Sequence, residues 1–169
     1  IVRRRLDLYL NPVRVEDARG PVSAADYDRQ GRLIRSERPD GSTRHFEYDP
    51  EGRLTRLLDA RGGEWRARYT PYGDCLEQTD PIGRTHRFSW DVEGRLSAIE
   101  NPKRENARFS YDLVGNLSRI QHFDASVEEA RYDRAARVIA RKRPDGTELT
   151  LTRDTTGSLL AIQHGDQTF

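Results

Sequence analysis

Short segments of the chain alternate between apolar and polar residues with a period of two. The pattern is clear in Glu-Trp-Arg-Ala-Arg-Tyr at 64–69, Thr-His-Arg-Phe-Ser-Trp at 85–90 and Asn-Ala-Arg-Phe-Ser-Tyr at 106–111. Apart from His86, the second, fourth and sixth residues of these segments are apolar, and the others are polar or charged. This alternation predicts half-buried β-strands with one apolar face. Since no helical periodicity is found, the sequence predicts an all-β fold built from consecutive hairpins.

The predicted strands recur with a fixed period of 21 residues. An aromatic residue stands at 27, 48, 69, 90, 111 and 132, and Arg153 takes this place in the seventh repeat. Four positions later stands Gly or, once, Ala136, and six positions later stands Leu, Val or Cys75. Such a period predicts a repeat architecture, in which each repeat packs mainly against its neighbours.

Each repeat carries two turn signals that divide it into two short strands. The first is Tyr-Asp-x-x-Gly, as at 27–31, where Asp can accept hydrogen bonds from the following backbone and Gly tolerates a positive φ. The second is a Pro-x-Gly turn, as at 38–41. The strand after the first turn carries apolar residues three positions apart, such as Leu96 and Ile99. These fall on opposite faces of a regular strand, so we expect a bulge or twist there.

The phase of the repeat suggests a division of the chain into two parts. Residues 27–169 are predicted to form seven repeats, of which the last is incomplete. Residues 1–26 are predicted to form a degenerate N-terminal repeat with entry strands, because Asp-Ala-Arg-Gly at 17–20 lies two periods before the same string at 59–62. Since the sequence contains no Met, even at position 1, we expect it to be an excised or processed piece.

Composition narrows the range of functions. Hydrophobic and charged residues each make up 34% of the chain, which suits a thin or single-layer architecture. The formal net charge is only +1, so nucleic acid is not expected as a partner. Cys75 is the only cysteine, which excludes an intrachain disulfide. No apolar run approaches the roughly 18 residues of a membrane span.

Residues with catalytic or metal-binding potential have simpler structural interpretations. The Asp that recurs beside each turn is interpreted as a turn cap rather than as part of a carboxylate ladder. His122 and His164 share a phase but lie four strands apart, roughly 19 Å, which is too far for one metal ion. Cys75 replaces Leu in its column and is interpreted as a packing residue. We therefore predict no catalytic, metal-binding or cofactor-binding residue and expect no enzyme.

Two further patterns describe the faces of the predicted strands. The recurrent Tyr and Trp share a phase with Phe46, Phe88 and Phe109, so a common apolar face explains them better than stacking on sugars does. On the other face, Arg and Glu are interleaved, which suggests a solvated face with cross-strand ion pairs.

The repeat motif resembles a known family. The strings YDRQGRL at 27–33, YDPEGRL at 48–54, WDVEGRL at 90–96 and YDLVGNL at 111–117 are similar to RHS repeats, which are also called YD repeats. This resemblance implies a long, curved β-sheet that spirals into a hollow shell. In bacterial members the shell belongs to a polymorphic toxin or an insecticidal toxin complex and encloses a C-terminal toxin domain until delivery. In animals, similar repeats build the barrel of teneurins.

Several repeats depart from the family pattern. Thr70 follows the aromatic residue where the family has Asp, Ala136 replaces the turn glycine, and the turns at 101–105 and 122–126 lack the Pro-x-Gly signature. We expect these turns to bend differently. Bacterial shells often end in a self-cleaving DPxGL-type motif, and the nearest string here is DPIGR at 80–84. Because it lies in phase with the ordinary repeat turn, we interpret it as a turn and assign no protease residues.

The resemblance implies a structural function. We expect a segment of a β-cage that encapsulates a C-terminal toxin domain of the same polypeptide, in an effector secreted or injected from a bacterial cell. Secretion-system spike proteins, as in type VI secretion, and chaperones are further expected partners. The alternative is a cell-surface adhesion or carbohydrate-binding β-repeat module.

Overall fold

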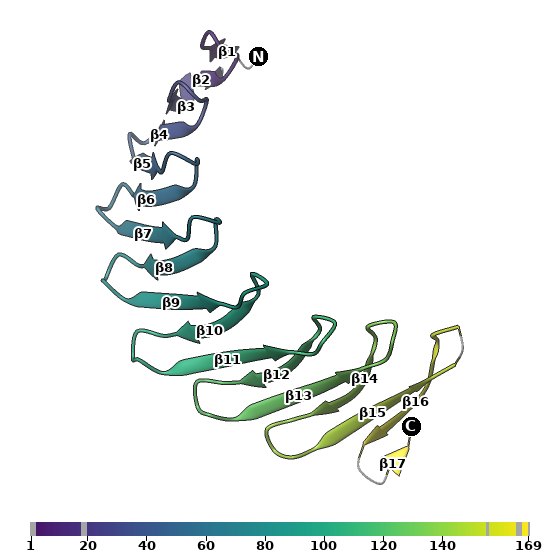
Figure 1. Ribbon diagram of the computed structural model, residues 1–169. Coiled ribbons are helices and arrows are strands. Elements are labelled where there is room, and N and C mark those ends of the chain that lie inside the picture. Colours follow the sequence, from purple (N-terminus) through teal and green to yellow (C-terminus); the bar gives the residue numbers. More distant parts are fainter. Residues whose placement is uncertain (1–2, 18–19, 155, 165–166, 169) are drawn as a thin grey trace. The chain divides into compact units, whose positions relative to one another are not determined.

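The computed structural model describes residues 3–17, 20–154, 156–164 and 167–168, and its regular elements are all β-strands. The chain divides into two compact units, residues 1–86 and 87–169. Figure 1 shows that within each unit the strands succeed one another in chain order. Among the described residues, no helix has the length and apolar character needed to cross a membrane. The predicted all-β fold of consecutive hairpins is confirmed.

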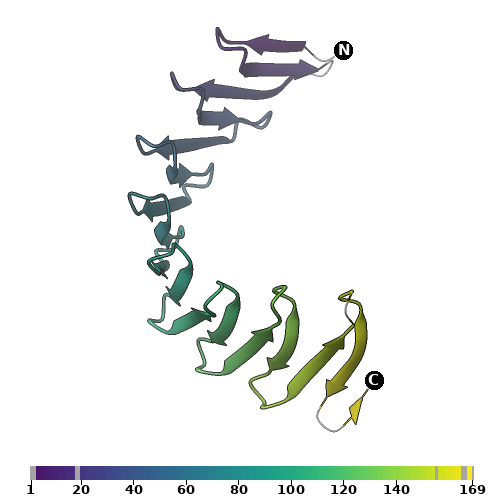
Figure 2. The same cartoon turned by 45° about the vertical axis from the view of Figure 1, so that its right-hand side comes forward.

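The strands of the first unit are β1 (Arg3–Leu6), β2 (Pro12–Asp17), β3 (Gly20–Tyr27), β4 (Leu33–Glu37), β5 (Thr43–Tyr48), β6 (Leu54–Leu58), β7 (Glu64–Tyr69) and β8 (Cys75–Thr79). The boundary between the units falls within β9 (Thr85–Trp90). The second unit continues with β10 (Leu96–Glu100), β11 (Asn106–Tyr111), β12 (Leu117–Gln121), β13 (Val127–Tyr132), β14 (Val138–Lys142), β15 (Glu148–Arg153), β16 (Leu159–His164) and β17 (Gln167–Thr168). Inside each unit, strands that are consecutive in the chain pair antiparallel, as the two views in Figures 1 and 2 show.

The hairpins closed by the Tyr-Asp turn contain the expected bulge. In the β5–β6 hairpin, Leu54 pairs with Tyr48 and Leu57 pairs with Phe46, which leaves Thr55 as an extra residue on β6. Because Phe46 and Tyr48 point to the same side of β5, the bulge also brings Leu54 and Leu57 to one face. The same register shift recurs in the β3–β4, β7–β8, β9–β10, β11–β12, β13–β14 and β15–β16 hairpins.

The two faces of the strands differ as the alternation predicts. We call the side that carries the repeat tyrosines the tyrosine face and the opposite side the charged face. Along β11, Ala107 is buried and Phe109 and Tyr111 are half-buried on the tyrosine face, whereas Arg108 and Ser110 are exposed on the charged face. Other members of the tyrosine face are Phe46, Tyr48, Leu54, Leu57, Trp65, Ala67, Tyr69, Leu96, Ile99, Leu117, Ile120, Ala130 and Tyr132.

Neither unit has a thick core. Among the described residues, the buried apolar side chains are Ala107, 5% exposed, and Ala140, 4% exposed, and no large side chain is fully buried. Trp65 on the tyrosine face is 40% exposed. The described strands of each unit therefore form one layer, in agreement with the low hydrophobic content. Stability must come mainly from contacts between neighbouring strands, because no second layer covers either face of a unit in the described part of the chain.

The expectation that the atypical turns bend differently is wrong. Arg104, Ala125 and Ala136 take the glycine position with φ of 68°, 65° and 58°, which is the left-handed conformation that glycine adopts in the other turns. Each turn is closed by the usual two backbone hydrogen bonds, as in the bonds from His122 N to Ser126 O (2.8 Å) and from Ala125 N to His122 O (3.0 Å). The backbone hydrogen bonds and the strand register hold the turn in this conformation. The residue in the glycine position therefore carries a backbone strain of about 1–2 kcal/mol.

The first described hairpin has the same design. In the β1–β2 hairpin, Asp7 N donates to Asn11 O (3.0 Å), Leu10 N donates to Asp7 O (3.2 Å), and Leu10 has a φ of 66°. Asp7 and Leu10 stand one period before Asp28 and Gly31. The turn geometry of the repeat therefore occurs upstream of Tyr27.

Candidate functional site

The Tyr-Asp turn forms a polar cluster that is built around one carboxylate. Asp28 Oδ1 accepts hydrogen bonds from the backbone amides of Gln30 and Arg32, both at 2.9 Å, and Asp28 Oδ2 accepts one from Arg32 Nε at 2.6 Å. The same guanidinium donates through Nη1 to the carbonyl oxygen of Asp49, 3.0 Å away in the next repeat. It also lies over the ring of Tyr48, 5.0 Å from the centroid. One arginine thus connects two successive turns.

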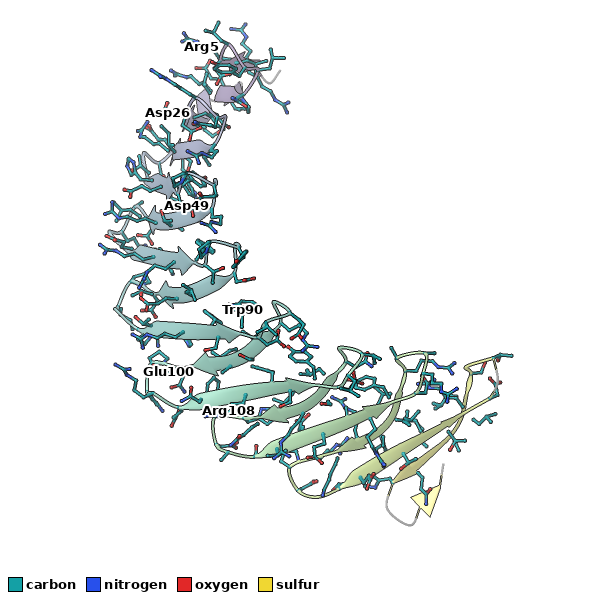
Figure 3. All side chains as sticks on the ribbon, in the orientation of Figure 1. Arg5, Asp26, Asp49, Trp90, Glu100 and Arg108 are labelled. Atoms are coloured by element: carbon teal, nitrogen blue, oxygen red, sulfur yellow. The ribbon has the colours of Figure 1, made fainter. Side chains whose placement is uncertain are left out.

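This arginine contact recurs along the chain. Arg53 binds Asp49 (2.6 Å) and the carbonyl oxygen of Thr70 (2.7 Å), and its guanidinium lies 5.1 Å from the Tyr69 ring centroid. Figure 3 shows Asp49 at the turn that joins β5 to β6. The corresponding pairs in the second unit are Arg95–Asp91 (2.7 Å) and Arg137–Asp133 (2.8 Å), and Arg95 lies 4.6 Å from the Tyr111 ring centroid.

The tyrosine hydroxyls supply a second connection between repeats. Each donates a hydrogen bond to the carbonyl oxygen of the Leu fifteen residues earlier: Tyr48 to Leu33 (2.9 Å), Tyr69 to Leu54 (2.9 Å), Tyr111 to Leu96 (2.8 Å) and Tyr132 to Leu117 (2.8 Å). We call these tyrosine bonds, together with the bonds from Arg32 and Arg53 to the turn carbonyl of the next repeat, the inter-repeat ladder. At Tyr48, Tyr69, Tyr111 and Tyr132 it adds side-chain bonds between neighbouring repeats to the strand pairing.

The contacts within each turn keep the Asp carboxylates ionised. Partial burial of Asp49 opposes ionisation, but hydrogen bonds from the Arg53 amide and guanidinium outweigh it, so the pKa of Asp49 lies below its ordinary value. Hydrogen bonds from the Arg137 amide and guanidinium lower the pKa of Asp133 in the same way. The interpretation of these residues as turn caps is confirmed. Within the described ranges, no three His, Cys, Asp or Glu side chains are grouped as metal ligands would be.

Sequence reasoning assigned no role to the arginine after the turn glycine. The signal was present, because Arg occupies this column at 32, 53, 95 and 137. Asn116 stands in the same column, and its amide replaces the guanidinium, with Nδ2 2.9 Å from Asp112 Oδ2. A residue of this kind acts between repeats, so its partner lies 17 positions away and is not visible in a local pattern.

Comparison with known proteins finds one family that matches part of the chain. Residues 27–64 match the family model described as RHS Repeat. This stretch of the chain is similar to an RHS repeat. Residues 27–64 contain the Asp28 and Asp49 turns and the arginine that connects them. No curated protein matches the sequence.

A solved structure of a toxin complex shows a similar fold. The crystal structure of TcdB2-TccC3-Cdc42 matches with a TM-score of 0.56 and 16% identity, over 99% of this chain and 13% of that chain. The structure of the Photorhabdus luminescens Tc holotoxin pore with a mutated TccC3 gives a TM-score of 0.47 and 14% identity over 99% of this chain and 14% of that one. TcdB2-TccC3 without the hypervariable C-terminal region gives 0.47 and 16% over 97% of this chain and 11% of that one. This chain therefore spans a small part of the length of each.

On the charged face, the repeats carry the predicted cross-strand ion pairs. Arg56 lies 2.6 Å from Glu47 on one neighbouring strand and also binds Glu64 on the other. The Arg56 and Arg66 guanidinium groups lower the pKa of Glu64 to about 2. Further pairs are Arg87–Glu100 (2.7 Å), Arg119–Glu129 (2.9 Å) and Arg131–Glu148 (2.7 Å). The face is solvated, as predicted, so each pair contributes about 0–1 kcal/mol.

The remaining candidates from the sequence do not converge on one site. Cys75 is half-buried, and burial raises the pKa of its thiol, in keeping with a packing role. His122 follows β12 and lies 3.3 Å from Glu128, whereas His164 ends β16, four strands further on. In the string at 80–84, Asp80 Oδ1 accepts bonds from the amides of Ile82 (3.1 Å) and Arg84 (2.9 Å), which confirms that this string is a turn.

Proposed function

We propose that this chain is a structural segment of a shell that encloses a toxin domain of the same polypeptide. The observation that carries the proposal is the inter-repeat ladder. It recurs with the same atoms at Tyr48 and Tyr69 in the first unit and at Tyr111 and Tyr132 in the second, and the described strands follow one another without an inserted helix. A protein built this way can extend by adding repeats, because each repeat depends only on its neighbours.

Two comparisons support this proposal. Residues 27–64 match the RHS repeat, and proteins with this repeat are expected to form a hollow shell. The fold similarity to TcdB2-TccC3-Cdc42 covers 99% of this chain but 13% of that one, so a complete wall of that size needs many more repeats than this chain contains. We also propose that residues 1–26 form a degenerate repeat and that 27–169 form seven repeats, the last incomplete. The turn at Asp7 supports an upstream repeat.

A one-layer wall is suited to separating two compartments. Its charged face carries ion pairs that remain accessible to water, and its tyrosine face presents half-buried apolar and aromatic side chains. We infer a non-catalytic role, with the chemistry located in the enclosed domain. In this proposal the whole protein is a bacterial effector that is secreted or injected, and secretion-system spike proteins or chaperones assist its delivery.

Protease protection of the full-length protein tests the proposal. The intact protein and the isolated non-repeat domain are treated with the same nonspecific protease, and the domain is followed by immunoblotting. We expect the domain to survive in the native protein and to be degraded when it is alone or when the repeats are denatured. Rapid digestion in the native protein, or a reading frame without such a domain, contradicts encapsulation and favours the adhesion or carbohydrate-binding alternative.

A further inference from the structure

A cavity of about 330 Å³ lies beside Ala67 in the first unit, and most of its lining belongs to the tyrosine face. Leu54 and Leu57 of β6 form one wall, and Trp65 and Tyr69 of β7 form another. Its volume falls at the lower end of the range for small-molecule and side-chain pockets. Trp65 is 40% exposed, so a large aromatic surface borders the cavity and remains accessible.

The cavity has a cause in the sequence. At steps of 21 residues, the strand position of Ala67 is filled by Phe46 in the repeat before and by Phe88 in the repeat after. Phe46 lies opposite Leu57 in its hairpin, whereas Ala67 lies opposite Gln78. A ring that fills this column in neighbouring repeats is therefore missing at Ala67, and its place is open.

A second cavity, of about 240 Å³ in the second unit, also lies beside an alanine of this column. It lies beside Ala130, which interrupts the same column three repeats after Ala67. Its lining includes Leu117, Ile120 and Tyr132, the counterparts of Leu54, Leu57 and Tyr69. Both cavities therefore lie beside an alanine at the strand position that Phe46 and Phe88 occupy, and both are lined by residues from corresponding positions of the repeat.

The two cavities differ in charge at two corresponding positions of their lining. Beside Ala130, the positions of Trp65 and Gln78 are taken by Glu128 and Arg141, which lie 3.9 Å apart. Placing an apolar group against this pair would remove charged groups from water at a substantial cost. The Ala67 cavity has neutral residues, Trp65 and Gln78, at these two positions. Of the two cavities, the one at Ala67 therefore suits an apolar occupant.

We propose that the Ala67 cavity binds an aromatic side chain presented by another segment of polypeptide. Leu57 lies opposite Phe46 and Leu54 lies opposite Tyr48, so leucines and a tyrosine share a face with a Phe ring in the preceding hairpin, and Trp65 offers a ring for offset stacking. The occupant is a segment of the enclosed domain, an assignment that rests on the proposed function. The amide of Gln78 and the imidazole of His86 border the cavity and are suited to hydrogen bonding with the backbone of that segment.

A sugar is a weaker fit. Trp65 could stack on a pyranose, but a sugar also needs several polar partners around its ring. Two polar side chains in the lining are already engaged, since the Tyr69 hydroxyl donates to Leu54 and the Arg56 guanidinium binds Glu47 and Glu64. The cavity is thus better matched to an apolar ring.

Peptide titration followed by NMR tests the proposal. The probes are the blocked pentapeptide Gly-Gly-Phe-Gly-Gly and its counterpart with Ala in the centre, added to the ¹⁵N-labelled chain. We expect saturable shifts of the Ala67 and Gln78 amides with the Phe peptide and about tenfold weaker binding of the Ala peptide. Ala67→Phe should weaken binding of the Phe peptide about tenfold, because it restores the missing ring. Ala130→Phe, which fills the second cavity, is the matched control and should leave binding unchanged.

Other outcomes overturn the proposal. Equal shifts with both peptides, or unchanged binding in Ala67→Phe, would exclude an aromatic pocket at Ala67. Saturable shifts of the same amides with N-acetylglucosamine but not with the Phe peptide would identify a sugar site instead. If Ala67→Phe does not fold, Trp65→Ala should weaken binding by about threefold or more, and no change would contradict the proposal. Protease protection in the full-length protein does not depend on this cavity, so failure here leaves the proposed function standing.

Discussion

The hydroxyl of Tyr69 donates a hydrogen bond of 2.9 Å to the carbonyl oxygen of Leu54, fifteen residues earlier in the chain. The two residues belong to successive repeats and lie on the neighbouring strands β6 and β7, so the bond spans the hairpin that joins one repeat to the next. Leu54 is also the residue at which the β5–β6 register shifts. The tyrosine of the repeat motif therefore has a structural role, because it satisfies a carbonyl group beside the bulge of the preceding hairpin.

Removal of this hydroxyl should weaken the contact between repeats. We predict that Tyr69→Phe lowers the free energy of unfolding by about 1 kcal/mol, because the ring is kept and one part-buried hydrogen bond is lost. Urea denaturation followed by circular dichroism measures this. Tyr72→Phe is the matched control, since Tyr72 is 94% exposed at a turn and should change stability by less than about 0.5 kcal/mol. Equal losses in both variants would contradict a role of the hydroxyl in the ladder.

The arginine of the ladder should matter more than an arginine on the charged face. Arg53→Gln loses the contacts with Asp49 and the Thr70 carbonyl and the stacking on Tyr69. We predict a loss of about 1–3 kcal/mol in the free energy of unfolding. Arg108→Gln, at an exposed position on the charged face, should cost less than about 0.5 kcal/mol. If the two substitutions have the same effect, the Arg53 contacts do not couple the repeats.

Relief of backbone strain should stabilise one turn. Ala136 has a φ of 58°, in the left-handed region where a Cβ atom is unfavourable. Ala136→Gly should therefore raise the free energy of unfolding by about 0.5–1 kcal/mol, after allowance for the greater entropy of Gly in the unfolded chain. Ala135→Gly, one position earlier in the same turn, should be neutral or destabilising. Thermal unfolding of the two variants distinguishes them, and destabilisation by Ala136→Gly would contradict the observed turn conformation.

Acid should loosen the turns. Hydrogen bonds from Arg53, which outweigh the opposing effect of burial, hold the pKa of Asp49 below its ordinary value of 3.8. A carboxyl group with a lowered pKa stabilises the fold when it is ionised in both states, and this contribution disappears as pH falls through the folded-state pKa. The urea midpoint should thus be constant above about pH 5 and should fall below about pH 4. Asp49→Asn should reduce this dependence, and an unchanged slope in that variant would exclude Asp49 as a source.

The last prediction concerns the register of β7. Deletion of Arg66 shifts half of β7 by one residue and moves Trp65 and Ala67 relative to the tyrosine face. We expect the deletion to prevent cooperative unfolding of the first unit, whereas Arg66→Ala removes an exposed side chain and should cost less than about 0.5 kcal/mol. Circular dichroism melts of both variants provide the measurement. Similar melting curves would mean that the alternation of faces is not essential.

Local patterns were sufficient to predict much of this fold from the sequence. The 21-residue period, the strand positions, the two faces and the bulge after the turn glycine all follow from residues close together in the chain. The bulge was predictable because Leu96 and Ile99 have the wrong spacing for one face of a regular strand. The interpretation of Asp80 as a turn cap also depended only on its neighbours.

The turns without glycine show where local reasoning failed. Sequence alone suggested a different bend at 122–126, but Ala125 adopts the conformation of glycine there. The strands on either side are held by their own neighbours, and this pairing constrains the turn more strongly than the intrinsic preference of alanine does. The sequence shows that alanine occupies the glycine position, but it does not show that strand pairing outweighs the resulting backbone strain.

By itself, the sequence determined the repeat, the faces of its strands and the capping role of Asp28 and Asp49, because each depends on residues within one hairpin. Only the tertiary structure decided that Arg32 binds the carbonyl of Asp49 and that the missing ring at Ala67 leaves a cavity beside Trp65. These features arise where successive hairpins lie side by side. Their partners are brought together by strand pairing across many residues, so no single segment of the sequence contains them.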